Sequence, residues 1–192
     1  MAGRRAADAT ADPAADPTAD PAVGPTAPAT AGGAVRPDLE RVFRTSYPRV
    51  VGVAARVLGS RDAADDVAQE VFLAFARSAV PTAEAPGWLS VAAAHTALNA
   101  LRGERRRTRR EQPDPAAVQT APDAADVVVV AEDRRRVREA VARLPRTQAV
   151  VLVLRHSGLS YAEVAAACGL SPGSVGTTLR RAENALREEL DR

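Results

Sequence analysis

The chain has one cysteine, two histidines, no lysine and no isoleucine, and only 3% of its residues are aromatic. A single cysteine excludes an intrachain disulfide, and with two distant histidines it does not form a metal-binding set. Cys168 lies on an apolar helix face and is expected to be buried. No apolar run approaches the length of a membrane span. Arg4 and Arg5 lack the apolar core of a secretion signal, so we expect a cytoplasmic protein.

Catalytic sequence motifs are also missing. The chain has no glycine-rich phosphate loop, and its serine, histidine and acidic residues lack the context of an activated nucleophile. We therefore expect a protein that is not an enzyme and that uses no cofactor and no metal.

Basic charge is present only as arginine and is unevenly distributed. All 26 basic residues are arginine, which fits GC-rich coding as well as selection for phosphate binding. Residues 36–112 carry a net charge of +4 and residues 132–192 a net charge of +3, whereas residues 1–35 and 113–131 are acidic. Two basic blocks suit a polyanionic partner such as a nucleic acid, although ordinary solvated helix surface gives the same pattern.

Composition divides the chain into four parts. Residues 1–35 are mostly Ala, Pro, Thr, Asp and Gly without large apolar side chains, which predicts a disordered tail. Residues 111–131 combine three prolines with acidic residues and alanines, which predicts a flexible tether. The remaining parts, residues 36–110 and 132–192, are each long enough for a small domain. They are called here the first module and the second module.

Apolar residues recur at helical spacing in three segments of the first module. Two of these segments are residues 38–58 and 61–77, separated by a Gly-Ser stop, and a third helix begins at Trp88. Pro48 either interrupts the first segment or starts its second half. Residues 78–87 contain two prolines and are predicted to form a loop.

Helical patterns also fill the second module. Residues 132–144 and 146–156 each place apolar residues on one face, and Pro145 separates them. Val127–Val130 is β-branched, but no partner strand exists elsewhere, so we assign it to a helix start. The chain is therefore expected to be all-α, with two small helical domains joined by the tether.

Residues 160–187 have the spacing of a helix-turn-helix, which places its second helix in the major groove of DNA. Ser160 and Glu163 match a capping box at the start of the first helix. Gly169 would end that helix because glycine adopts positive φ without strain, and Ser171-Pro172 would start the second helix. A helical hairpin that only packs against the core is the alternative interpretation.

Each module carries three short motifs that occur together in one protein family. The first module has Tyr47-Pro-Arg-Val50, the acidic segment Asp62–Phe72 and Trp88-Leu89. The second module has Leu144-Pro145, Val151–Arg155 and Leu159–Val164. In order and spacing, these motifs resemble regions 2 and 4 of bacterial RNA polymerase sigma factors of the sigma-70 class. The resemblance is to the small two-domain type, the extracytoplasmic-function (ECF) sigma factors.

The resemblance implies a transcription initiation factor. Such a factor binds core RNA polymerase at the β′ clamp helices and the β flap, and it directs promoter-specific initiation by recognising the −10 and −35 elements. It also implies an anti-sigma protein as a further partner and no insertion into a membrane.

The resemblance also implies which residues make these contacts. The β′ clamp helices would bind the acidic helix of the first module, at Asp65, Asp66, Gln69 and Glu70. The −10 element would be recognised by Trp88, His95, Asn99, Arg102, Arg105 and Arg106. The −35 element would be recognised by Ser171, Ser174, Thr177, Thr178, Arg180 and Arg181. An acidic surface suits a basic protein partner rather than DNA, which agrees with the first of these assignments.

Several positions leave room for other interpretations. Trp88 also fits a core position, and His95 stands where the family often has asparagine. Gly176 and Thr178 stand where the family often has basic residues, and the loss of two cationic contacts would weaken DNA binding and its salt dependence. The alternatives are a stand-alone helix-turn-helix DNA-binding transcriptional regulator and a sigma-like protein that sequesters a partner without starting transcription.

Overall fold

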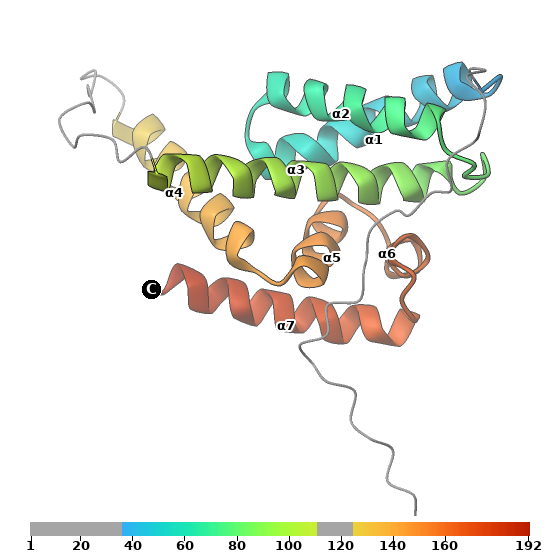
Figure 1. Cartoon of the computed structure of the whole chain (residues 1–192). Coiled ribbons are helices and arrows are strands. Elements are labelled where there is room, and N and C mark those ends of the chain that lie inside the picture. Colours follow the sequence, from blue (N-terminus) through green and yellow to red (C-terminus); the bar gives the residue numbers. More distant parts are fainter. Residues whose placement is uncertain (1–35, 111–124) are drawn as a thin grey trace, which may run out of the picture.

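The computed structural model describes residues 36–110 and 125–192, which form seven helices and no strand (Figure 1). The helices are α1 (Leu39–Leu58), α2 (Arg61–Ala76), α3 (Ala85–Arg110), α4 (Ala125–Arg143), α5 (Arg146–His156), α6 (Tyr161–Cys168) and α7 (Pro172–Leu190). The predicted all-α class is confirmed for this part of the chain. The predicted disordered tail and residues 111–124 of the predicted tether lie outside the described residues.

Helices α1, α2 and α3 form the bundle of the first module. α1 continues through Pro48, so this proline neither breaks the helix nor starts a new one. Gly59 ends α1 with a φ of 71°, which glycine adopts without strain, and its N–H donates to the Ala55 carbonyl. Ser60 then caps α2 by accepting a hydrogen bond from the Ala63 N–H. The predicted bounds of these two helices are confirmed to within one residue.

Two helices begin earlier than the sequence patterns predict. α3 begins at Ala85 rather than at Trp88, because a turn leads directly into it and the Ala85 N–H donates to the Thr82 carbonyl at 3.2 Å. Pro86 fits there because the first turn of a helix does not need its N–H. α4 begins at Ala125, which confirms that Val127–Val130 belongs to the start of a helix. Residues 125–131 are therefore helix rather than tether.

The start and end signals predicted for the helix-turn-helix are confirmed. The Ser160 hydroxyl accepts from the Glu163 N–H, and the Glu163 carboxylate accepts from the Ser160 N–H, which completes the capping box. Gly169 ends α6 with a φ of 65°. Ser171 caps α7, and Pro172 is the first residue of that helix. Because each signal is local in sequence, it could be recognised without knowledge of the tertiary structure.

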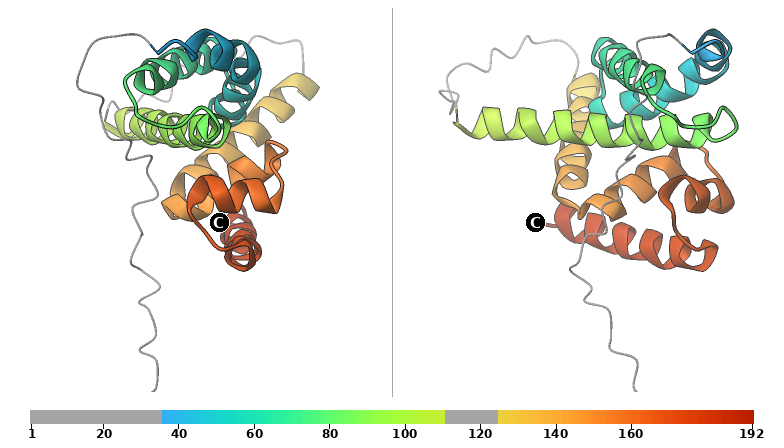
Figure 2. Two further views of the ribbon diagram at one scale, coloured as in Figure 1. Left: turned by 90° about the vertical axis from the view of Figure 1, so that its right-hand side faces the viewer. Right: turned by 45° about the vertical axis from the view of Figure 1, so that its right-hand side comes forward.

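The two modules pack against each other through α3, which the sequence did not predict. In all three ribbon views α3 lies between α1 and α2 on one side and α5, α6 and α7 on the other (Figures 1 and 2). Every residue from Leu89 to Ala94, and also His95, is buried. Residues 86–101 contain no Asp, Glu, Lys or Arg. A helix without a charged face is typically buried on all sides. The absence of charge in residues 86–101 was therefore the sequence signal that α3 would be covered on both sides.

Candidate nucleic-acid and protein interfaces

The recognition helix of the helix-turn-helix, α7, has one buried face and one exposed face. Its buried face consists of Val175, Leu179 and Ala182, which pack against the rest of the second module. Of the six residues predicted to contact the −35 element, only Thr178 is half-buried. The other five are exposed: Ser171, Ser174, Thr177, Arg180 and Arg181. The amphipathic pattern therefore leaves a continuous polar face available for DNA.

The first two residues of this polar face also build the start of the helix. Ser171 Oγ accepts a hydrogen bond from the Ser174 N–H at 3.2 Å, and the two hydroxyl oxygens lie 2.7 Å apart. The serine pair thus satisfies an amide group that would otherwise lack a partner at the helix N-terminus. The two serine hydroxyls are thus bonded to each other in the cap, whereas Thr177, Arg180 and Arg181 are exposed further along the same face.

An aromatic residue that the sequence analysis missed lies beside the recognition helix. Tyr161, the first residue of α6, is 44% exposed, and the Arg155 guanidinium lies 5.5 Å from its ring centroid. A Cβ atom added at Gly176 would lie 3.6 Å from Tyr161 Cε1, which is an ordinary van der Waals distance. Gly176 therefore leaves room for a Cβ atom next to an exposed aromatic ring. A tyrosine directly after a helix cap was the sequence signal for this exposure.

The residues predicted to recognise the −10 element are divided by the packing of the two modules. Asn99 and Arg106 are exposed, whereas Arg105 and Trp88 are half-buried. The Trp88 ring packs near Phe75, with the two ring centroids 6.0 Å apart. His95 is only 4% exposed. The helix from Trp88 thus presents some of the predicted contacts to solvent and covers others.

Two of the predicted −10 contacts bond to the second module. The Arg146 Nε–H donates to His95 Nδ1 at 2.6 Å, which requires that this nitrogen carries no proton. Arg102 donates from Nε to the Ala142 carbonyl at 3.1 Å and from its Nη2 to the Leu144 carbonyl at 2.8 Å. These carbonyls lie at the C-terminal end of α4, where a cation is favourable. In this arrangement neither side chain is directed to DNA.

The loop before α3 is fastened by a residue that the sequence analysis missed. Arg36 donates to the carbonyls of Ser78 and Val80, at 3.3 and 2.6 Å, and its guanidinium lies 4.2 Å from the Phe75 ring centroid. It also pairs with Asp38 at 2.8 Å. Hydrogen bonds from Arg36 and Thr82 hold the pKa of the Asp38 carboxyl well below its usual range. Arg36 therefore fixes the loop that leads to the predicted −10 contacts.

The acidic residues of α2 border a groove with an apolar floor. Asp66, Gln69 and Glu70 are exposed, whereas Asp65 is half-buried and accepts a hydrogen bond from the Tyr47 hydroxyl at 2.9 Å. That hydrogen bond, together with burial, raises the pKa of Tyr47. The groove has a volume of about 800 Å³. Of the four predicted polymerase contacts, Asp65, Asp66 and Gln69 line this groove and Glu70 does not.

Two large apolar side chains are exposed in this groove, and the sequence analysis missed both. Phe43 is 41% exposed and Leu73 is 51% exposed. Exposed apolar surface with a polar rim is typical of a protein-binding site. Leu73 lies off the apolar stripe of its helix, which was the sequence signal for its exposure.

Within residues 36–110 and 125–192, no group of three or more His, Cys, Asp or Glu side chains is placed to hold a metal ion. Among the helices of the same two segments, none combines the length and the apolar character needed to cross a membrane.

Comparison with known proteins assigns both modules. Residues 42–107 match the family described as Sigma-70 region 2, and residues 134–186 match Sigma-70, region 4. The chain is 32% identical to the RNA polymerase sigma factor CarQ of Myxococcus xanthus, over 79% of this chain and 88% of CarQ. It is 33% identical to the ECF RNA polymerase sigma factor SigK of Mycobacterium ulcerans, over 74% of this chain and 80% of SigK.

A solved structure of the sigma factor RpoE in complex with the anti-sigma factor NepR, from Bartonella quintana, is also similar. It is 21% identical and covers 80% of this chain and 97% of RpoE, with a TM-score of 0.46. The sequence matches decide the assignment because they include both regions in the order that the motifs predicted. The chain belongs to the extracytoplasmic-function group of the sigma-70 family, the RNA polymerase sigma factors that direct transcription initiation.

Proposed function

We propose that the groove beside α2 and the polar face of α7 are the two main functional surfaces of this sigma factor. The groove binds core RNA polymerase, and α7 recognises the −35 element. The observation that carries this proposal is the placement of an exposed acidic and apolar groove on one module and an exposed arginine-bearing recognition helix on the other. The module boundaries proposed are residues 36–110 for region 2 and 132–192 for region 4, with the helical start of α4 preceding the latter.

The polymerase contact combines charge with apolar burial. Asp66 and Gln69 would pair with basic groups of the β′ clamp helices, while Phe43 and Leu73 lose their exposed surface. Such complementarity speeds association and fixes register, and apolar burial supplies most of the affinity. Region 4 would contact the β flap in the same complex.

The DNA contacts differ in chemistry between the two elements. Arg180 and Arg181 would recognise duplex −35 DNA in the major groove, where an arginine bidentate to guanine is the commonest specific contact. Asn99, Arg102 and His95 would contact unstacked −10 bases, with Arg105 and Arg106 on phosphates. Trp88 would support this site from its packing against Phe75.

The remaining assignments follow from the family and the composition. The protein acts in the cytoplasm, uses no cofactor and has no catalytic activity of its own. An anti-sigma protein that covers these surfaces would regulate it.

Reconstituted transcription tests this proposal against both alternatives. Core polymerase with the purified chain should give run-off transcripts that core polymerase alone does not. A stand-alone regulator would shift promoter DNA by itself and would not co-elute with polymerase. A sequestering protein would co-elute with polymerase but would give no new transcript.

A further inference from the structure

We propose that Arg36 is a positioning residue for recognition of the −10 element. It holds the loop before α3, and with it the start of α3, in the shape that unstacked −10 bases require. This inference rests on the proposed function, which assigns the −10 contacts to α3. Arg36 precedes residues 42–107, the segment that matches Sigma-70 region 2, so the family assignment gives it no role.

Arg36 joins the start of α1 to the segment between α2 and α3. Its Nη1 group donates to the Ser78 carbonyl at 3.3 Å and to the Val80 carbonyl at 2.6 Å. Its Nε and Nη2 groups donate to the two carboxylate oxygens of Asp38, at 3.0 and 2.8 Å. A guanidinium can form all these bonds at once because it carries five N–H donors in a fixed plane, whereas a lysine ammonium cannot.

Thr82 completes this set of contacts from the loop. Its hydroxyl donates to the Asp38 carboxylate, so Asp38 accepts hydrogen bonds from both Arg36 and the loop. We call Arg36, Asp38 and Thr82, together with the carbonyls of Ser78 and Val80, the Arg36 clasp. Because its bonds reach three positions of the segment between α2 and α3, the clasp restrains the backbone of this segment and not only one side chain.

The clasp also reaches the start of α3. The Thr82 carbonyl accepts from the N–H of Ala85, the first residue of that helix, at 3.2 Å. The Arg36 guanidinium lies 4.2 Å from the Phe75 ring centroid, which is 6.0 Å from that of Trp88. Arg36 therefore supports Trp88, a predicted −10 contact, through Phe75 and through the loop.

The ion pair of the clasp is sheltered from solvent. The side chains of Arg36 and Asp38 are 17% and 18% exposed, whereas those of the pair Arg44 and Glu40 on α1 are 75% and 76% exposed. Water and salt screen a sheltered pair less than an exposed one, and exposed pairs contribute little. The first pair is therefore suited to hold a fixed geometry, and Arg44 provides the matched control.

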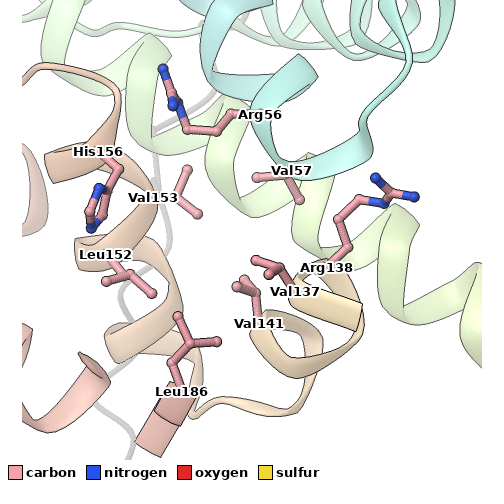
Figure 3. A pocket seen from close by; sticks show the side chains of 9 residues that line it. All are labelled: Arg56, Val57, Val137, Arg138, Val141, Leu152, Val153, His156 and Leu186. Carbon is pink, nitrogen blue, oxygen red and sulfur yellow. The ribbon is translucent and has the colours of Figure 1, made fainter. Parts of the chain in front are cut away.

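The clasp and one part of the contact with the second module lie at opposite ends of α1. Arg56 and Val57, near the C-terminal end of α1, line a pocket of about 260 Å³ that α4, α5 and α7 complete (Figure 3). The clasp lies at the N-terminal end of this helix, whose 20 residues span about 30 Å. Substitutions in the clasp should therefore leave the packing at this pocket unchanged.

Binding of single-stranded DNA by the holoenzyme tests the proposal. Core polymerase with the native chain first selects its preferred −10 sequence from a pool of random single strands. The selected strand and its single-base variants are then the probes. Arg36→Ala should weaken binding of the selected strand about tenfold, because a loop that must become ordered on binding costs affinity. Its preference for the selected bases should also fall, whereas affinity for core polymerase and for duplex −35 DNA should stay unchanged.

Two further variants separate positioning from charge. Arg36→Lys keeps the charge but not the planar donors, so it should lose as much −10 affinity as Arg36→Ala. Asp38→Asn keeps the shape of the side chain but removes the ion pair, so it should weaken −10 binding severalfold. Arg44→Ala should bind like the native chain. Native binding by Arg36→Lys would overturn the proposal. Tighter binding by Asp38→Asn would also overturn it, since it would mean that a released Arg36 contacts DNA directly.

Proteolysis of the free chain keeps the proposal falsifiable if Arg36→Ala does not fold, because Asp38→Asn preserves the shape of the clasp. Glu84 is exposed in the turn before α3. Cleavage after Glu84 by a glutamate-specific protease should be severalfold faster in Asp38→Asn than in Arg44→Ala, at a temperature at which both are folded. Equal cleavage rates would overturn the proposal. A native holoenzyme that selects no −10 sequence would instead contradict the proposed function, and the cleavage rates would still report whether the clasp holds the loop.

Discussion

The two helices that we propose to contact DNA, α3 and α7, are presented in opposite ways. The polar face of α7 is exposed, whereas part of the α3 face that would contact the −10 element lies under the second module. This difference separates a contact that is available in the free chain from one that depends on the arrangement of the modules.

The difference has a simple origin in the two sequences. α7 carries charged residues along one face and a narrow apolar stripe on the other, so it can be covered on one side only. α3 has no charged residue between positions 86 and 101, so it can be covered on both sides. The basic segment that follows, residues 102–110, extends beyond the core and is largely exposed.

The largest expected effect is at the groove of the first module, which is open even though the neighbouring α3 face is covered. Asp66→Arg with Gln69→Arg should lower affinity for core polymerase at least tenfold, because like charges would face the basic partner. Binding to duplex −35 DNA should be unchanged. Co-elution with core polymerase measures the first effect. Asp133→Arg, an exposed acid on α4, is the control, and equal losses in both variants would refute the assignment of this groove.

A smaller effect is expected at the exposed recognition helix. Arg181→Ala should cost about 1–3 kcal/mol of promoter binding if the side chain contacts guanine, without changing polymerase binding. Electrophoretic mobility shifts with duplex −35 DNA measure the loss. Arg187→Ala, six residues further along α7, should bind normally. Equal loss of DNA and polymerase binding in Arg181→Ala would indicate misfolding rather than a lost contact.

Two substitutions at Gly176 separate the effect of helix stability on DNA binding from the effect of charge. Gly176→Ala should stabilise α7 by about 1 kcal/mol, because glycine is a poor helix former, without changing the salt dependence of DNA binding. Gly176→Arg should also bind −35 DNA more tightly, with a salt slope steeper by about one. A Cβ atom at position 176 would be in ordinary van der Waals contact with Tyr161, so the alanine fits without a clash. Thermal melts and binding at several salt concentrations measure both effects, and an unchanged slope for Gly176→Arg would show that this position does not approach a phosphate.

The smallest effect concerns Cys168, whose reactivity reports whether the second module stays folded when its contact with the first module is weakened. Its side chain is buried within the second module, and burial raises the pKa of the thiol to about 11. At pH 8 the native thiol should therefore react with iodoacetamide far more slowly than a free cysteine. Arg146→Ala, which removes the hydrogen bond to His95 of the first module, should leave this rate unchanged. A faster reaction in that variant would mean that loss of this contact also loosens the packing around Cys168.

Local signals made most of the helices predictable from the sequence. The caps at Ser160 and Ser171, the end of α6 at Gly169 and the burial of Cys168 all depend on residues within one or two turns. The starts of α3 and α4 were less predictable because prolines and valines permit more than one conformation there.

The packing of the modules could not be predicted in the same way. Arg102 bonds to backbone carbonyls about 40 residues away, and any residue presents a carbonyl, so no side-chain pattern marks these partners. The approach of Gly87 to Ala167 depends on two small residues that are common throughout the chain. Only the uncharged length of α3 indicated that both of its sides would be covered.

The most direct test of the central claim is to sequence the 5′ ends of RNA made in vitro from a pool of genomic fragments. Core polymerase is compared with and without the purified chain. The account predicts a set of new 5′ ends that appears only with the chain, preceded by two shared short motifs at the −10 and −35 positions. A pool of RNA ends identical in both reactions would contradict it.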